Sequence, residues 1–254
     1  MDVLFLDAPF AGTVELCPET IDYLKRKQYH TVGLYASVQF CNALDRVRTQ
    51  LKELEIVIVT SQPDRTHASS QLLGCDNDLN SLRLGEEERR AIDCYLYIGD
   101  GRFHPLALVY GQKDLSSEEV REVVMNDPVH HSLTILAVYD IVSLLKKYRG
   151  ALLKFIAADR VGVLVTIKPG QEQFKPGLLL EQKYPLKKFY YFIDNVISFD
   201  QLENFPFVNV WVNTACPRVG FDDQEKFVKG VINLYDALNA EKVLEQKSVL
   251  NELK

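Results

Sequence analysis

The chain has 254 residues, of which 47% are hydrophobic and 25% are charged, an ordinary composition for a soluble globular protein. Its formal net charge of -6 provides no basic field, so direct binding of nucleic acid is not expected. We expect a cytoplasmic protein without a membrane segment, because no secretory signal pattern opens the chain and the longest apolar stretch, 133–145, is shorter than the ~20 residues that span a bilayer.

The first half of the chain alternates between patterns typical of strands and of helices. In chain order it predicts a strand, a helix and three further strands, at 31–38, 41–55, 56–59, 93–98 and 106–110. The acidic residues that follow Ser116 predict the start of a helix, which Asn126, Asp127 and Pro128 would end. The second half predicts a long helix, a strand, an interrupted helix, two strands and a charged helical tail, at 132–157, 161–167, 171–183, 189–193, 208–212 and 224–254.

Two series of strands and helices therefore follow one another, one on each side of residue 128. We expect an α/β protein with two similar small parallel-sheet (Rossmann-like) domains and covering helices, at 1–127 and 128–254. Ligands of such sheets bind beyond the carboxyl ends of the strands. Four unusual loops follow predicted strands at that edge, QFCN (39–42), GDGRFH (99–104), KPGQ (168–171) and NTACPR (213–218).

Two of these loops are rich in glycine. In GDGRFH the glycines permit close approach of a ligand to the backbone, Asp100 could accept hydrogen bonds from a ribose or an amine, and His104 could position a carboxylate. A tight turn after a strand, without a role in binding, explains these residues equally well. KPGQ, which ends at Gln171, lacks the remaining residues of a P-loop, and on local grounds a Pro-Gly turn is the favoured interpretation.

The five cysteines are an odd number in a chain without a secretory signal, which argues against a disulfide framework. Their simplest interpretation is as small buried hydrophobic residues. Cys75 and Cys216 differ because each lies in a turn-like context, and Arg218 would favour the thiolate of Cys216. Neither belongs to a CxxC pair, so zinc-ribbon spacing is absent.

Cysteines on separate loops can still meet if the loops share one edge, and three thiolates would suit a 4Fe-4S cluster with an open site on one iron. Cys94 lies in an apolar strand and is expected in the core. Cys41 is a weaker candidate for a third ligand, and Cys17 has no predicted place. No Ser-His-Asp arrangement is predicted, and no residue is assigned a catalytic role.

Five segments together resemble diphthamide synthase, the archaeal-type 2-(3-amino-3-carboxypropyl)histidine synthase. They are LYASVQF (34–40), LLGCD (72–76), YLYIGDGRFHPLAL (95–108), VGVLVTIKPGQ (161–171) and VNVWVNTACPR (208–218). The resemblance covers about residues 14–225, and their order and approximate spacing agree with the family.

The resemblance implies a non-canonical radical S-adenosylmethionine enzyme of three similar α/β domains, each giving one cysteine to a 4Fe-4S cluster. The reaction would move a 3-amino-3-carboxypropyl group from S-adenosyl-L-methionine to a histidine of translation elongation factor 2, in a homo- or hetero-oligomer. Cys75 and Cys216 match the cluster ligands of the second and third domains. Four further positions match family motifs and become candidate S-adenosylmethionine contacts: Gln39, Asp100, His104 and Gln171.

The family's first domain and its cysteine loop have no counterpart here, and residues 1–20 resemble the linker that follows that domain. We expect a separate subunit to supply the third cysteine. Two alternatives remain open, namely that Cys41 or Cys17 substitutes for it, or that the chain is a non-catalytic accessory subunit. A nucleotide-binding α/β module without a cluster is a further alternative.

Overall fold

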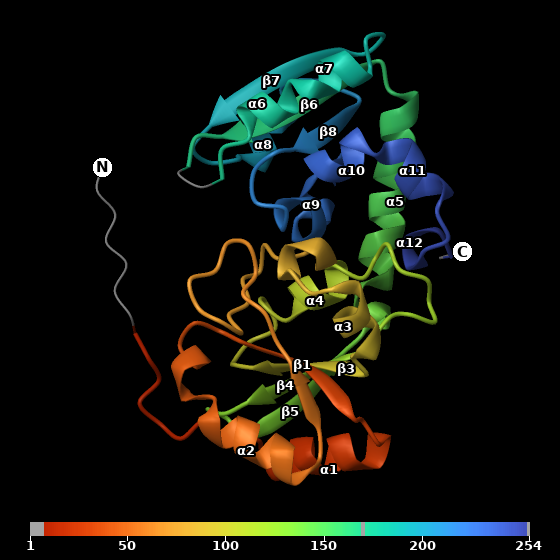
Figure 1. The fold of residues 1–254 in the computed structure, drawn as a ribbon. Coiled ribbons are helices and arrows are strands. Elements are labelled where there is room, and N and C mark those ends of the chain that lie inside the picture. The colour runs from red at the N-terminus through yellow and green to blue at the C-terminus, as the bar shows by residue number, and fades with distance from the viewer. Residues whose placement is uncertain (1–7, 169–170, 253–254) are drawn as a thin grey trace. The chain divides into compact units, whose positions relative to one another are not determined.

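The computed structural model describes residues 8–168 and 171–252 of the chain (Figure 1). The chain forms two compact units. The first holds the residues up to Gln112 together with Glu119–Asp140, and the second holds Lys113–Glu118 together with the chain from Ile141 onward. Each unit is described by itself below.

The first unit is built on a five-stranded sheet with the strand order β2-β1-β3-β4-β5. Its strands are β1 (Thr31–Ala36), β2 (Val57–Val59), β3 (Cys94–Ile98), β4 (Val123–Asp127) and β5 (Ser132–Leu136). The first four strands are parallel, and β5 runs antiparallel to β4. Leu34, Leu96 and Val124 lie opposite one another on the three central strands, and all three are fully buried. Apolar side chains contribute most to the stability of a parallel sheet at fully buried positions on its central strands.

Helices cover both faces of this sheet, α1 (Pro18–Lys27) and α2 (Asp45–Glu53) one face and α3 (Glu86–Ala91) and α4 (Leu106–Tyr110) the other (Figure 1). Short 3₁₀ turns, η1 (Cys41–Ala43) and η2 (Leu79–Leu82), complete the connections. The sequence begins α1 with Pro18 in the first turn, where the missing N–H has no helical partner, and ends it at Gln28, whose φ of 56° is left-handed.

Three expectations for the first unit are wrong. Residues 106–110 form α4 rather than a strand, because a five-residue apolar run of which four residues are buried does not reveal its period. Residues 123–127 form β4 instead of continuing a helix from Ser116. Residues 132–136 form β5, since the tight turn at 128–131 returns the chain antiparallel to β4 and the long helix begins only later. Helices α1 and α3 were not predicted.

The second unit contains a four-stranded parallel sheet in the order β7-β6-β8-β9. Its strands are β6 (Arg160–Thr166), β7 (Lys188–Asp194), β8 (Val210–Asn213) and β9 (Val231–Asn233). This order repeats that of the first four strands of the first unit, with the first strand of the series between the second and the third. The expected class of two similar parallel sheets with covering helices is therefore confirmed, with β5 as an antiparallel addition.

Helix α5 (Val142–Ala157) contacts β8 and β9, and α7 (Leu179–Lys183) contacts β7. The other helical elements are η3 (Val138–Ile141), which bridges the unit boundary, α6 (Phe174–Gly177), α8 (Phe199–Leu202), α9 (Val219–Asp222), η4 (Gln224–Lys226), α10 (Leu234–Leu238), α11 (Ala240–Glu245) and α12 (Val249–Glu252). Gly150 does not interrupt α5. The tail predicted as helical contains β9, a buried strand too short to show periodicity.

Aromatic side chains fill one face of this second sheet. Trp211 is buried and meets Phe192 edge to face, with ring centroids 5.0 Å apart. Phe192 also meets Phe205 at 4.5 Å, and Phe199 meets Phe227 at 5.0 Å. Edge-to-face geometry adds to the gain from burial alone, so this cluster defines the sheet's packing on that face.

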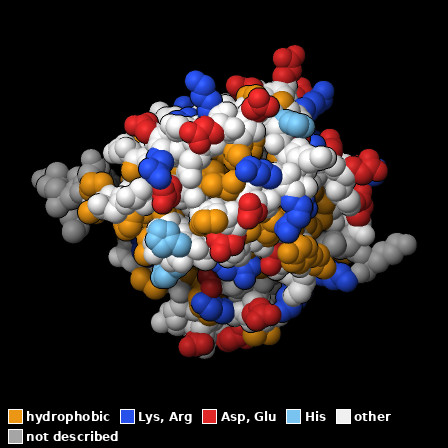
Figure 2. All heavy atoms as spheres, turned by 90° about the horizontal axis from the view of Figure 1, so that it is seen from below, with side chains coloured by type: hydrophobic (Ala, Val, Ile, Leu, Met, Phe, Trp, Pro, Cys, Tyr) orange, Lys and Arg blue, Asp and Glu red, His pale blue; other side chains and the backbone are white. Residues whose placement is uncertain are grey.

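The surface over α1 and α2 mixes acidic and basic side chains rather than gathering one sign of charge (Figure 2). No helix among the described residues combines the length and the apolar character needed to cross a membrane.

Candidate functional site

The strand order places a topological switch point in each sheet. In the first unit the chain leaves β1 toward β2 and then crosses back to β3, so the loops after β1 and β3 diverge at their carboxyl ends. In the second unit the loops after β6 and β8 do the same. Ligands of parallel α/β sheets bind in the crevice at such points. The residues predicted from the four unusual loops fall on these two edges.

Gln39 lies in the turn directly after β1 and is exposed. The Ser37 hydroxyl is 3.4 Å from its side-chain oxygen, and the Phe10 amide donates to its carbonyl at 3.0 Å. The ring of Phe10 packs on Phe40 with centroids 5.1 Å apart. The segment before α1 therefore holds the Gln39 turn in place while leaving its side chain open to solvent.

The GDGRFH loop follows β3. Asp100 is exposed, and Gly101 has a φ of 69°, the left-handed conformation that favours glycine. His104 is half-buried, and its ring meets that of Phe103 edge to face at 5.3 Å. The structure thus brings Gln39, Asp100 and His104 to one edge of one sheet, as predicted from their place after neighbouring strands.

Tyr97, near the end of β3, was not singled out from the sequence. Its hydroxyl is buried, and no described group makes a hydrogen bond of good geometry with it, although Ser37 lies nearby. Buried polar atoms are seldom left in this state. Burial also raises the pKa of this phenol above its ordinary value. An unsatisfied hydroxyl beside the GDG loop is the kind of group that a bound polar ligand satisfies.

The Cys75 loop follows β2 but is bonded to the end of β1. The Ala36 amide donates to the Ser70 carbonyl at 2.7 Å, and the Leu72 amide donates to the Ala36 carbonyl at 2.9 Å. Gly74 lies so close to the Phe103 ring that a Cβ atom there would overlap it. The cysteine loop therefore contacts the GDGRFH loop, and a larger side chain at position 74 would require the exposed Phe103 ring to move.

Cys75 is partly exposed at this contact. Asp76, the next residue, is buried and accepts the Leu73 amide at 2.8 Å. Burial raises the pKa of the Asp76 carboxyl, and the Leu73 hydrogen bond offsets only part of that effect. The side chain of Asp76 thus closes the turn that presents Cys75.

At the second edge, Gln171 and Cys216 lie on loops after the neighbouring strands β6 and β8. Thr214 fixes the start of the Cys216 loop, because both its amide and its hydroxyl donate to the Leu164 carbonyl of β6, at 3.0 and 2.8 Å. Gln171 is half-buried, and its amide donates to the Lys168 carbonyl in a turn at 3.1 Å. The Pro-Gly pair of the KPGQ motif, 169–170, lies outside the described residues.

Cys216 is partly exposed. Arg218, expected to act on this thiol, is buried, and its guanidinium pairs with Asp222, Nε donating to a carboxylate oxygen at 2.7 Å. The positive charge near Cys216 is therefore shared with a carboxylate that lies one helical turn away.

The other three cysteines are less suited to binding a metal. Cys94 is fully buried in β3, and burial raises the pKa of its thiol far above the ordinary value. Burial raises the pKa of Cys41 to about 11, and its sulfur lies 3.2 Å from the Ser37 carbonyl, which accepts its hydrogen. Cys17 is buried, with its sulfur 3.1 Å from the Thr20 hydroxyl. Thiolates are the form that binds metal, and burial opposes that form at Cys41 and Cys94.

Cysteine sulfur is the donor type of iron–sulfur clusters, and Cys75 and Cys216 each offer it from a partly exposed loop. Within residues 8–168 and 171–252, no set of three or more His, Cys, Asp or Glu side chains is gathered as a metal site would need.

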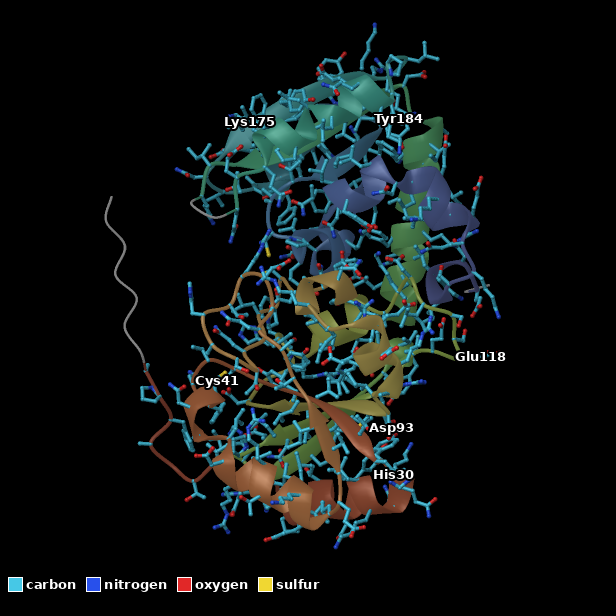
Figure 3. All side chains as sticks on the ribbon, in the orientation of Figure 1. His30, Cys41, Asp93, Glu118, Lys175 and Tyr184 are labelled. Atoms are coloured by element: carbon cyan, nitrogen blue, oxygen red, sulfur yellow. The ribbon has the colours of Figure 1, made fainter. Side chains whose placement is uncertain are left out.

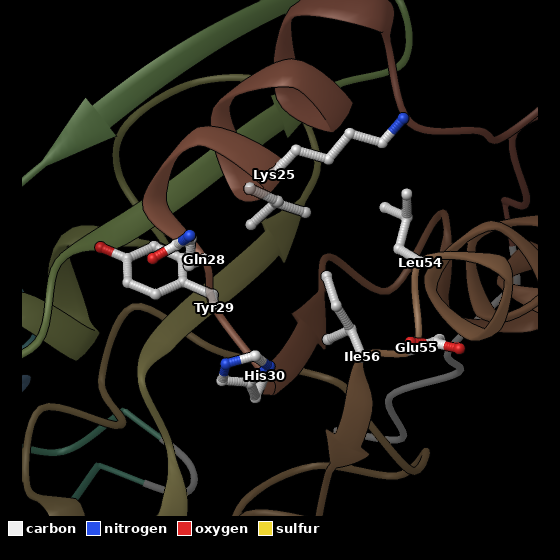
Figure 4. Close-up of a pocket in the computed structure, with 8 residues that line it drawn as sticks. Lys25, Gln28, Tyr29, His30, Leu54, Glu55 and Ile56 are labelled. Atoms are coloured by element: carbon white, nitrogen blue, oxygen red, sulfur yellow. The ribbon is translucent and has the colours of Figure 1, made fainter.

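The opposite end of the first sheet holds a separate hollow of about 370 Å³ between the ends of α1 and α2 (Figure 4). Leu24 and Ile56 form its apolar part, and Lys25, His30 and Glu55 lie around it. His30 and Asp93 mark this amino end, whereas Cys41 lies at the other (Figure 3). The hollow contains none of the predicted site residues.

The sequence model of a family described as "Putative diphthamide synthesis protein" matches residues 1–250. The 2-(3-amino-3-carboxypropyl)histidine synthase of Pyrococcus horikoshii is 30% identical over 225 residues, which cover 87% of this chain and 60% of that protein. Subunit 1 of the synthase of Schizosaccharomyces pombe is 25% identical over 230 residues, covering 86% of this chain and 48% of the relative.

A crystal structure of Dph2 from Pyrococcus horikoshii with a 4Fe-4S cluster shares the fold, with a TM-score of 0.69 at 20% identity over 92% of this chain and 64% of that one. A second crystal structure of the same protein gives a TM-score of 0.67. The chain spans about half to three fifths of the length of the two curated relatives that it matches.

Proposed function

The chain belongs to the family of putative diphthamide synthesis proteins, and we propose that it acts in the first step of diphthamide biosynthesis. The proposed reaction moves a 3-amino-3-carboxypropyl group from S-adenosyl-L-methionine to a histidine of translation elongation factor 2. The relatives named as synthases support this proposal. The chain would act as a transferase within a homo- or hetero-oligomer.

We propose that Cys75 and Cys216 are two thiolate ligands of a 4Fe-4S cluster. The observation that carries this proposal is the contrast among the five cysteines. These two are partly exposed on loops at the carboxyl edges of parallel sheets, whereas Cys17 and Cys94 are buried. Cys41 is partly exposed, but its raised pKa opposes the thiolate. The third ligand would come from a partner subunit outside residues 1–254.

Four residues would hold S-adenosylmethionine, namely Gln39, Asp100, His104 and Gln171. Asp100 is exposed at the edge beside the unsatisfied Tyr97 hydroxyl, and a carboxylate there can accept hydrogen bonds from an amine or a ribose. His104 lies on the loop that contacts the Cys75 turn through Phe103 and Gly74. When bound, the cluster would supply the electron for cleavage of the bond between sulfur and the γ-carbon.

Anaerobic reconstitution with iron and sulfide, in the presence of a first-domain partner, tests the ligand assignment. We expect absorbance at about 400 nm from a thiolate-bound iron–sulfur cluster. Cys75→Ala and Cys216→Ala should each abolish this absorbance. Cys41→Ser is the matched control and should retain it, because that thiol is protonated and bonded to a backbone carbonyl.

A colourless protein in the presence of the partner would contradict cluster binding. If the chain then still binds the partner, and binds it equally well without both cysteines, a non-catalytic accessory subunit would be the better account. Retained binding of S-adenosylmethionine without iron would instead favour a nucleotide-binding module.

A further inference from the structure

Two buried asparagine side chains hold the loop that carries Cys216. The Asn213 amide group accepts the Ala215 N–H at 3.1 Å and donates to the Cys216 carbonyl at 2.9 Å. It also donates to the side-chain oxygen of Asn233 at 2.9 Å, and Asn233 in turn donates to the Pro217 carbonyl at 3.0 Å. The backbone on both sides of the Cys216 sulfur is thus fixed by hydrogen bonds from one amide pair.

This amide pair rests on a buried polar network in the same unit. The backbone N–H of Asn233 donates to the Tyr148 hydroxyl at 2.9 Å, and that hydroxyl donates to the Asp236 carboxylate at 2.5 Å. The other oxygen of Asp236 accepts from the Lys113 ammonium at 3.1 Å. Tyr148, Asp236 and Lys113 are all buried.

The charges of this network are kept inside the protein. Burial alone would lower the pKa of Lys113, but the carboxylates of Asp236 and Asp114 outweigh burial and raise that pKa above its ordinary value. Burial and the Asp236 charge raise the pKa of the Tyr148 phenol well above its ordinary value. These shifts favour the charged form of Lys113 and the protonated, donating form of Tyr148.

A network of this kind is not the simplest way to stabilise a core. Buried ion pairs are often no better for stability than well-packed apolar side chains, and their best-attested use is to specify one arrangement. Here the network ends on the one loop of this unit that carries an accessible cysteine. A thiolate ligand needs its backbone held rigidly if it is to meet a metal with fixed geometry.

We propose that Asn213 and Asn233 are positioning residues for the Cys216 thiol, and that Tyr148, Asp236 and Lys113 hold Asn233 in place. The role of Cys216 as a ligand rests on the proposed function, but the positioning of its loop does not. Loss of the amide pair would free the Cys216 backbone and leave the Cys75 loop, in the other unit, unchanged.

The rate at which iodoacetamide alkylates Cys216 in the folded full-length chain, followed by peptide mass spectrometry, tests this proposal. Asn213→Ala and Asn233→Ala should each raise the Cys216 rate about tenfold, because each removes two or more hydrogen bonds from the loop or its support. Tyr148→Phe removes only a hydroxyl and should raise it about threefold. Cys75 in the same molecules is the internal reference, and its rate should not change.

Phe155→Leu is the matched control, because Phe155 lies on α5 with Tyr148 but packs on Tyr184 instead of on the network. It should lower the melting temperature without raising the Cys216 rate. Cys216 rates within twofold of the parent in all three network variants would overturn the proposal. An equal rise in the Phe155→Leu control would also overturn it, since the effect would then be general loosening.

Iron binding provides a second readout that separates this proposal from the proposed function. In the reconstituted complex, Asn213→Ala should at least halve the iron bound per chain. If neither the parent nor any variant binds iron, the proposed function fails. The Cys216 alkylation rates of the variants and the parent then still test whether the asparagine pair positions this cysteine. If all variants bind iron equally and alkylate equally, the positioning proposal fails and the cluster assignment stands.

Discussion

Replacing Lys113 by methionine would test the buried charge network most severely. Asp236 is 3% exposed and Lys113 is 7% exposed, so the variant leaves a carboxylate in the core without its cation. At 3.1 Å and an effective dielectric constant of ~20, the attraction that is lost is of order 5 kcal/mol. The Tyr148 hydrogen bond still stabilises the carboxylate, and breaking one partner of a buried pair usually costs ~3–5 kcal/mol. We therefore expect a loss of about 3 kcal/mol.

Urea unfolding followed by the fluorescence of Trp211 measures this loss in the second unit, because Trp211 is the one tryptophan of the chain and lies in β8. Asp236→Asn should cost less, about 2 kcal/mol, since Lys113 keeps Asp114 as a partner at 2.5 Å. The double variant should be more stable than the sum of the two losses predicts, by at least ~1.5 kcal/mol.

Lys147→Met is the control for the Lys113 variant. Lys147 lies on the surface of the same unit and pairs with the exposed Glu225, so its loss should leave the urea midpoint nearly unchanged. A Lys113→Met variant that loses less than ~1 kcal/mol, or single losses that simply add, would refute the assignment of a coupled buried pair.

Two further predictions concern packing and pH. Gly162→Ala should destabilise the second unit by ~1–3 kcal/mol and shift the Trp211 emission, because a Cβ there would overlap the indole ring, whereas Gly150→Ala, with open space around it, should be neutral or stabilising. The hydrogen bond and charge of Asp127 hold the pKa of His130 above its ordinary value of 6.5, so the stabilisation by this pair is complete below pH 6.5 and is lost as the pH rises through the folded-state pKa. An NMR titration should show this raised pKa falling toward 6.5 in Asp127→Asn, and an unchanged pKa would contradict the pairing.

Much of the sheet architecture could be predicted from the sequence. Buried parallel strands such as β1, β3 and β6 are continuous apolar runs, which a short window reveals. The errors lie where a pattern is too short to show its period. LALVY at 106–110 is uniformly apolar and forms α4, and VIN at 231–233 forms β9 within an otherwise helical tail.

The candidate site was predicted only in part, for a physical reason. Position after a strand is local in sequence, so Gln39, Asp100 and His104 could be assigned to one edge. The residues that orient the site are not local. Asn233 supports the Cys216 loop from 17 residues away, and Lys113 pairs with Asp236 across 123 residues. Contacts of this kind depend on the tertiary fold, and no spacing in the sequence reveals them.

Transfer of a labelled group tests the central claim most directly. The chain, combined with a cluster-competent first-domain partner, would be incubated anaerobically with a reductant, elongation factor 2 and S-adenosylmethionine labelled in its 3-amino-3-carboxypropyl carbons. We predict label on one histidine of elongation factor 2, and none when Cys75→Ala or Cys216→Ala replaces the parent chain. Equal labelling with the variant lacking both cysteines, or with the partner alone, would contradict the claim that this chain provides two ligands of the catalytic cluster.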